Sequence, residues 1–88
     1  MKLNTSFEVV DVSGEYMIIP LNNSTEVVNG VIVVTEAVAY LLKNMQDAKS
    51  EQDLVDLLMM EYDVEYERAQ EDVHTMVEKL TDLGVITT

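Results

Sequence analysis

The sequence predicts an α+β fold of the winged-helix type, in which a three-stranded antiparallel sheet is followed by three helices. Two observations predict it. Strand-like runs fill the first part of the chain, up to residue 34, and three amphipathic helical segments fill the remainder. There is also no repeat with a period of about 20 to 50 residues, which would indicate a solenoid. Because strands and helices are segregated along the chain, a parallel sheet is disfavoured.

The 88 residues predict a single domain spanning 1–88, since two separate cores would each be very small. The chain has no cysteine, so it has no disulfide and no thiolate site, as is usual in a reducing cytoplasm. The N-terminus lacks the apolar core of a signal peptide, and no apolar run approaches the length of about 20 residues that a membrane span requires. We therefore expect a cytoplasmic protein without membrane contact.

The first two strands are expected as a hairpin. Phe7 to Val12 alternates apolar and polar residues, Ser13-Gly14 supplies a turn, and Tyr16 to Pro20 forms the second strand. Proline cannot donate a backbone hydrogen bond, so Pro20 fits the end of a strand.

The third strand is expected at Val31 to Val34, after a reversal or kink at Asn29-Gly30. The run carries no charge. The simpler interpretation is a buried strand covered by the last helix; the alternative is an open sheet edge that accepts a partner.

Three helices follow. Thr35 is a good N-cap for a helix that runs to about Asn44, and Ser50 opens a second helix with an acidic first turn. The third helix is expected from about Glu65 to Leu83, where Gly84 can take the left-handed conformation that ends it. One side of this helix carries an apolar stripe that is mostly core, bordered by Gln70, His74 and Thr81 on one side and by Asp72 and Lys79 on the other.

The composition disfavours several functional classes. Seventeen acidic residues against five basic ones give a net charge of -12, which repels nucleic acid. Such acidity is typical of a solvated surface that keeps a small domain soluble and monomeric, and a basic partner surface is the alternative interpretation. The single histidine, His74, lies near Glu71 and Glu78 on one helix face, an arrangement typical of a solvated ion-pair cluster. With one histidine and no cysteine a zinc site is not expected, and no nucleophile motif or phosphate loop is present. We expect neither enzymatic activity nor a cofactor.

A family resemblance refines this interpretation. The segments Gly30-Val31-Ile32-Val33-Val34-Thr35-Glu36, Glu61-Tyr62-Asp63-Val64 and Leu80-Thr81-Asp82-Leu83-Gly84, with Ala69 and Asp72-Val73 between them, resemble the PqqD-like proteins in order and spacing. These are leader-peptide recognition elements of pathways that modify ribosomally made peptides. The sequence departs from the family pattern at Thr35, Val38 and Leu42, where asparagine, glycine and tryptophan are common.

The resemblance implies a non-catalytic adaptor. In this family a precursor's leader segment adds as an antiparallel strand to strand three, beside helix three, and is delivered to a modifying enzyme, often a radical S-adenosylmethionine protein. Backbone hydrogen bonds would supply affinity and side-chain pockets selectivity. The expected peptide-binding residues are Val27, Val28, Val31, Ile32, Val33, Val34, Gln70, Val73, His74, Met76, Val77 and Leu80.

Two other functions remain open from the sequence. A winged-helix nucleic-acid reader would use helix three for recognition, yet this helix is strongly acidic. An acidic regulatory or assembly subunit that binds no leader peptide is the other alternative. In each case the chain is expected to be a monomer or a weak homodimer, the latter formed edge to edge through strand three.

Overall fold

A computed structural model gives the structure of residues 1–21 and 31–87, and a β-hairpin forms most of its sheet. Strands β2 (Phe7–Val12) and β3 (Glu15–Pro20) pair antiparallel with Val12 opposite Glu15. The two linking residues both have positive φ, +54° at Ser13 and +84° at Gly14. A two-residue loop with this geometry is a type I′ turn, whose twist matches that of the flanking strands. The predicted hairpin is confirmed.

Strand β4 (Ile32–Val34) completes the predicted three-stranded sheet, in the order β2-β3-β4. It pairs antiparallel with β3, with Met17 opposite Val33. Within the described parts of the chain, β4 pairs with no other strand, so it is an edge of the sheet. Val27, Val28 and the turn predicted at Asn29-Gly30 lie outside the described residues.

The three predicted helices form, and the predicted N-caps of the first two are confirmed. They are α1 (Glu36–Lys43), α2 (Glu51–Glu61) and α3 (Tyr66–Asp82). The Thr35 Oγ1 accepts a hydrogen bond from the Val38 N–H, and the Ser50 Oγ accepts one from the Asp53 N–H. After α3 the chain turns at Gly84, where φ is +80°, as expected of a glycine that ends a helix. A 3-10 turn (Met45–Asp47) links α1 to the segment before α2.

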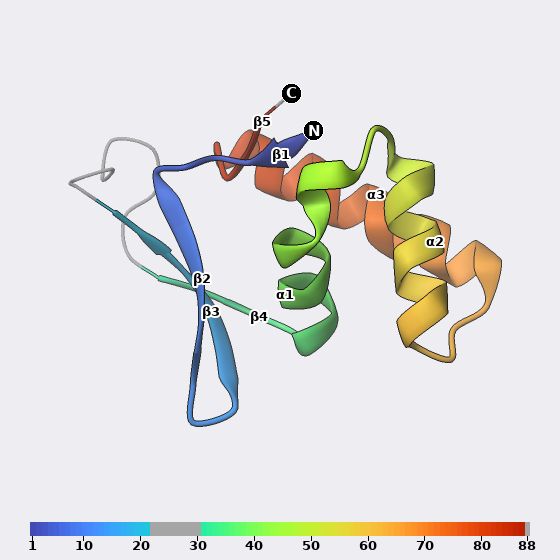
Figure 1. Cartoon of the computed structure of the whole chain (residues 1–88), viewed down its shortest axis with the longest axis horizontal. Helices are drawn as coiled ribbons and strands as arrows, with labels where there is room; N and C mark the ends of the chain where they lie inside the picture. Colours follow the sequence, from blue (N-terminus) through green and yellow to red (C-terminus); the bar gives the residue numbers. More distant parts are fainter. Residues whose placement is uncertain (22–30, 88) are drawn as a thin grey trace.

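The two chain ends pair with each other, a feature that the sequence pattern does not predict. Strand β1 (Lys2–Leu3) lies antiparallel to β5 (Ile86–Thr87), as Figure 1 shows at the top of the molecule. Asn4 ties them together: its N–H donates to the Val85 carbonyl at 2.7 Å and its side-chain amide to the Gly84 carbonyl at 2.9 Å. Residues 86 and 87 therefore belong to a small second sheet, and Val85 and Ile86 are buried in the core.

The core lies between the three-stranded sheet and the helices. In Figure 1, α1 stands beside the sheet, α2 lies beyond α1, and α3 crosses behind α1 from α2 toward the β1–β5 pair. Phe7 and Ile18 enter the core from the sheet, Leu42 from α1, Leu54 from α2 and Val73 from α3. None of the helices that the structure describes is long and apolar enough to cross a membrane.

Candidate peptide-binding groove

A groove of about 880 Å³ runs between strand β4 and helix α3. Its volume is within the range of about 300–1,000 Å³ that is common for ligand sites. Strand β4 forms one wall and α3 the other. The floor between these walls is apolar and comes from α1, from the end of α2 and from the segment before α3, with Val38, Leu41, Leu58, Tyr62 and Val64 as its main residues.

The β4 wall offers main-chain groups to a partner. A type I′ turn is closed by two hydrogen bonds between the residues that flank it, here Val12 and Glu15. Along antiparallel strands, alternate residues point their N–H and C=O groups to opposite sides. Counting from Glu15, the groups of Met17 face β2 and those of Tyr16 and Ile18 face β4.

The same alternation fixes the orientation of β4. Ile32 and Val34 stand opposite Ile18 and Tyr16, so their main-chain groups bond to β3. Val33 lies between them, and its N–H and C=O therefore point away from β3, along the open edge. Its side chain is 67% exposed, whereas Ile32 and Val34 pack against the core. Val33 is thus the residue of β4 that is placed to receive another strand.

The α3 wall carries a short polar rim above apolar residues. Asp72, Thr75 and Lys79 recur at intervals of three and four residues and so lie along one side of the helix, with Glu71 beside them. Met76 is buried and also lines the groove. The rim is acidic toward the beginning of α3 and basic toward its end.

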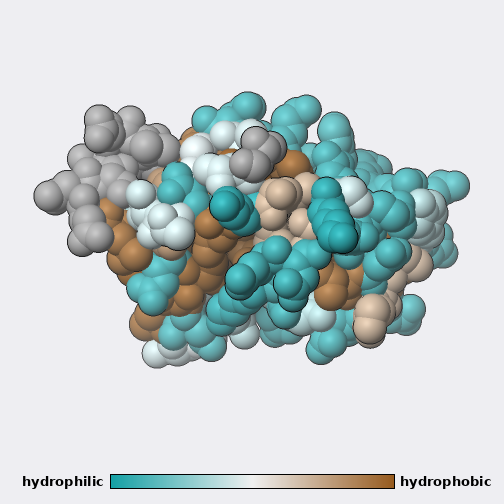
Figure 2. All heavy atoms as spheres, turned by 45° about the horizontal axis from the view of Figure 1, so that its top comes forward, coloured by the Kyte–Doolittle hydropathy of each residue, from teal (hydrophilic) through white to brown (hydrophobic). Residues whose placement is uncertain are grey.

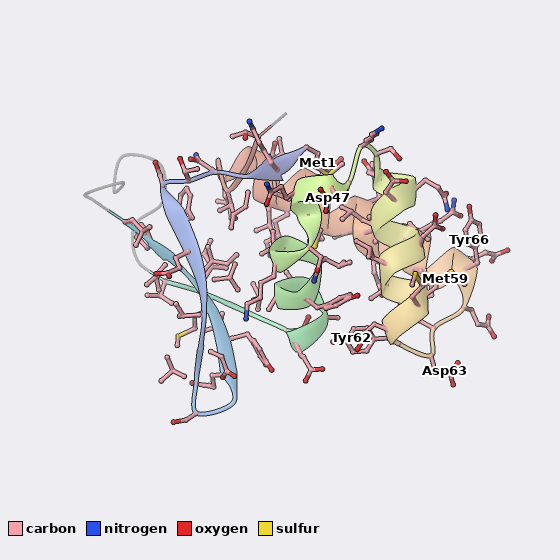
Figure 3. The ribbon with its side chains drawn as sticks, in the orientation of Figure 1. Met1, Asp47, Met59, Tyr62, Asp63 and Tyr66 are labelled. Carbon is pink, nitrogen blue, oxygen red and sulfur yellow. The ribbon has the colours of Figure 1, made fainter. Side chains whose placement is uncertain are left out.

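Tyr62 lines the groove where α2 ends. Figure 3 shows it at the end of α2, beside the first turn of α1. Its hydroxyl donates a hydrogen bond to Glu36 Oε2 at 2.9 Å, and its ring meets that of Tyr40 edge to face, with centroids 6.0 Å apart. Partial burial is the largest cause of a raised pKa at Tyr62, and the hydrogen bond to Glu36 and the negative charge of Glu36 raise it further. Together they raise the pKa of Tyr62 to about 12. The phenol therefore stays neutral at physiological pH.

The structure brings six of the predicted site residues together in the groove. These residues are Ile32, Val33, Val34, Val73, Met76 and Leu80. Val31 is 54% exposed and directly precedes β4 without lining the groove. The predicted residues Val27 and Val28 lie outside the described part of the chain.

Gln70, His74 and Val77 do not line the groove, because they lie toward the other border of α3. The Gln70 side-chain amide donates to the Tyr66 hydroxyl at 3.0 Å. His74 Nδ1 lies 3.1 Å from Glu51 Oε1, on helix α2. Val77 is half-buried and packs against the core. A direct role for these three residues in binding a peptide is still a prediction.

The groove also contains residues that the predicted site omitted. Glu71, Asp72, Thr75 and Lys79 from α3 and Tyr62 from the end of α2 all line it. The helical periodicity placed Asp72 and Lys79 on one border of α3, but the choice between the two borders depends on how α2 packs. Among the residues that the structure describes, no three His, Cys, Asp or Glu side chains are grouped so that they could hold a metal ion.

The surface differs between the two ends of the molecule. Figure 2 shows hydrophobic residues gathered over the strands, whereas hydrophilic residues predominate over the helices. On the sheet face that carries the Val33 side chain, Val10, Met17 and Val33 stand opposite one another across the three strands. Val33 belongs both to this cross-strand row and to the groove wall.

Comparison with known families decides the affiliation. The family described as coenzyme PQQ synthesis protein D (PqqD) matches residues 15–86, from the start of β3 to β5. The chain belongs to the PqqD family. Its match includes β4, α3 and hence both walls of the groove, while β1 and β2 lie before the matched range.

Two solved structures share the fold of this PqqD-family chain. TbiB1 in complex with the TbiA(beta) leader peptide superposes with a TM-score of 0.74 at 15% identity, covering 97% of this chain and 93% of the other. Lasso peptide synthetase B1 complexed with the leader peptide gives a TM-score of 0.75 at 18% identity, covering 99% and 96%. None of the curated proteins matches the chain significantly.

Proposed function

We propose that this chain is a non-catalytic adaptor that binds the leader segment of a ribosomally made precursor peptide. The leader adds to β4 as an antiparallel strand, beside α3, and the adaptor presents it to a modifying enzyme. One observation carries the proposal: the main-chain N–H and C=O of Val33 face an open edge that borders a groove with an apolar floor.

The family and the structural neighbours support this assignment. The chain is a member of the PqqD family, and both neighbours were solved with a leader peptide bound. Radical S-adenosylmethionine enzymes are frequent partners of this family, and we propose an enzyme of this class as the recipient of the leader. The acidic face of α3 gives no support to the alternative of nucleic-acid binding.

Because β4 is short, main-chain hydrogen bonds and side-chain contacts have different roles in binding the guest. A strand of three residues can offer few outward hydrogen bonds, centred on Val33. Such bonds are tolerant of sequence, so they provide affinity without selectivity. Selectivity must come from alternate side chains of the guest, which point into the groove between Met76 and the floor residues.

Removing a single main-chain donor tests the proposal. Val33→Pro deletes the outward N–H of β4, at a position where proline is tolerated because that N–H does not bond to β3. Val33→Ala is the matched control, since it shortens the exposed side chain and keeps the N–H. The ligand is the precursor peptide encoded beside the gene of this chain, and affinity is measured by calorimetric titration.

We expect Val33→Pro to weaken binding at least about tenfold, because the buried carbonyl of the guest loses its donor. Val33→Ala should weaken it much less. In the wild-type chain, amide NMR shifts upon titration should concentrate at Ile32–Val34 and along Asp72, Thr75 and Lys79. Unchanged affinity of a folded Val33→Pro protein, or shifts confined to other surfaces, would refute strand addition at β4.

A further inference from the structure

The charged side chains on the groove rim are ordered along α3: acidic residues come first and a basic residue follows. Glu71 and Asp72 lie in the first half of α3, and Lys79 lies about two turns further along, on the side of Asp72 and about 80° around the helix from Glu71; all three line the groove. Asp72 is partly neutralised by Arg68, whose Nε is 3.1 Å from Asp72 Oδ1. Within the described parts of the chain, neither Glu71 nor Lys79 forms an ion pair. One uncompensated charge of each sign therefore remains available to a guest.

The fold relates this direction to the direction of the guest. Figure 1 shows β4 running toward the start of α1, while α3 runs the opposite way. A guest that is antiparallel to β4 is therefore parallel to α3. Its N-terminal part passes Glu71 and its C-terminal part passes Lys79.

From this arrangement we infer that the groove selects guests by the order of their charges: a basic residue first, then an apolar anchor, then an acidic residue. The inference rests on the proposed function and goes beyond it by specifying the class of leader. It concerns order rather than net charge, since the whole chain, at -12, already attracts basic peptides.

The spacing of the two charges follows from helix and strand geometry. Lys79 is eight positions after Glu71, which is about 12 Å along a helix. An extended chain covers that distance in about four residues. Because side chains of a strand alternate, residues i and i+4 of the guest face the same wall. The expected pattern is a basic residue at i and an acidic one at i+4, with an apolar residue between them directed to the floor.

Other charges near the rim do not cancel this pattern. Glu36 lies at the same end as Tyr62, to which it is hydrogen-bonded, and adds to the acidic end. At the basic end, Glu78 does not line the groove, and its Oε2 lies 3.7 Å from His74 Nε2. Asp82 is one turn beyond Lys79 and does not line the groove.

Selection from a displayed peptide library tests the inference. Random dodecamers are selected on three immobilised proteins: the wild type, Val33→Pro, and the double variant Glu71→Lys/Lys79→Glu. The double variant keeps the net charge at -12, because one substitution adds two charges and the other removes two. Only the direction of the rim changes. Circular dichroism confirms that each protein is folded.

We expect wild-type binders to carry the basic residue four positions before the acidic one, and binders of the double variant to carry the reverse order. For one selected peptide, reversing its two charges should weaken binding about three- to tenfold, as two exposed ion pairs allow. The effect should disappear in about 0.5 M salt, where the Debye length is only a few ångströms.

The outcomes separate the two claims. Binders without charge order, or with the same order on both proteins, would overturn the inference while leaving strand addition intact. Enrichment of the opposite order on the wild type would also overturn it. If no peptide is enriched relative to Val33→Pro, strand addition itself fails, and the inference fails with it.

Discussion

At the scale of single residues, Val33 and Tyr62 offer different groups to a guest in the groove. Val33 has an exposed side chain and outward main-chain groups, so it belongs to the accessible wall. Tyr62 is half-buried in the groove lining, and its hydroxyl donates a hydrogen bond to Glu36 Oε2. A guest strand can therefore use the main chain of Val33, whereas Tyr62 offers mainly its ring.

The raised pKa of Tyr62 makes a prediction about alkaline stability. The pKa is about 12 in the folded chain, against 10.0 for an ordinary tyrosine, so the unfolded chain loses this proton first. The stabilisation is complete below about pH 10 and is lost as the pH rises through about 12. Urea unfolding should show a decline in stability over this window, and Tyr62→Phe should make that decline shallower.

Glu36→Gln provides the control for this prediction, because it keeps Tyr62 while removing the charge and weakening the acceptor. The pKa of Tyr62 should then fall, although burial alone still holds it above its usual value. The ¹³C shift of the Tyr62 Cζ atom reports the titration directly. A Tyr62 pKa that is the same in both proteins would show that Glu36 has no part in it.

At the scale of secondary-structure elements, the hairpin turn determines which side of β4 is open. Gly14 has φ +84°, and no atom lies within 4 Å of where a Cβ would be, so the site has room but an unfavourable backbone for alanine. Gly14→Ala should cost about 1 kcal/mol in the free energy of unfolding, purely from conformation. The measurement is urea unfolding of the two proteins.

Ser13→Asn is the companion substitution with the opposite expected sign. Asparagine tolerates positive φ and is favoured before glycine in type I′ turns, so a gain of about 0.5 kcal/mol is expected. If Gly14→Ala were neutral and Ser13→Asn destabilising, the turn would not be type I′. The assignment of the Val33 N–H to the open edge would then lose its basis.

The elements also show what the sequence could and could not predict. Thr35, Ser50 and Gly84 lie at helix ends that their own chemistry determines, and all three were predicted correctly. The β1–β5 pair escaped prediction, since strands of two residues are too short to display an alternating pattern.

The groove border was equally inaccessible from the sequence. Both flanks of α3 are polar, so helical periodicity alone gives no preference. The border is decided by tertiary contacts: His74 faces Glu51 of α2, and Tyr66 donates to Gln52 of the same helix. The opposite flank, with Asp72 and Lys79, is thereby left beside β4. The local sequence predicts that α3 is a helix, but it does not predict how that helix is rotated about its axis relative to its neighbours.

At the scale of the whole molecule, excess negative charge is the dominant electrostatic feature. The net charge is -12, and the ion pairs among the described residues are all solvent-exposed. Exposed pairs contribute little to stability. Self-repulsion therefore opposes folding and also opposes association of two copies through their β4 edges.

Salt should consequently stabilise this chain. Raising NaCl from about 20 mM to 500 mM shortens the Debye length from roughly 20 Å to about 4 Å and screens the repulsion. We expect the midpoint of thermal unfolding to rise by a few degrees, where about 1 kcal/mol corresponds to about 4–8 °C for a domain of this size.

Glu61→Lys sharpens this test, because it lowers the net negative charge by two and places a cation in the last turn of α2, which has no basic residue there. A lysine at a helix C-terminus stabilises by about 0.5 kcal/mol at low ionic strength, or about 2–4 °C here. Its advantage should shrink in 500 mM NaCl, and Glu61→Gln should give about half of it. If the wild-type midpoint does not change with salt and Glu61→Lys gives the same gain at both salt concentrations, long-range repulsion is not what limits the stability of this fold.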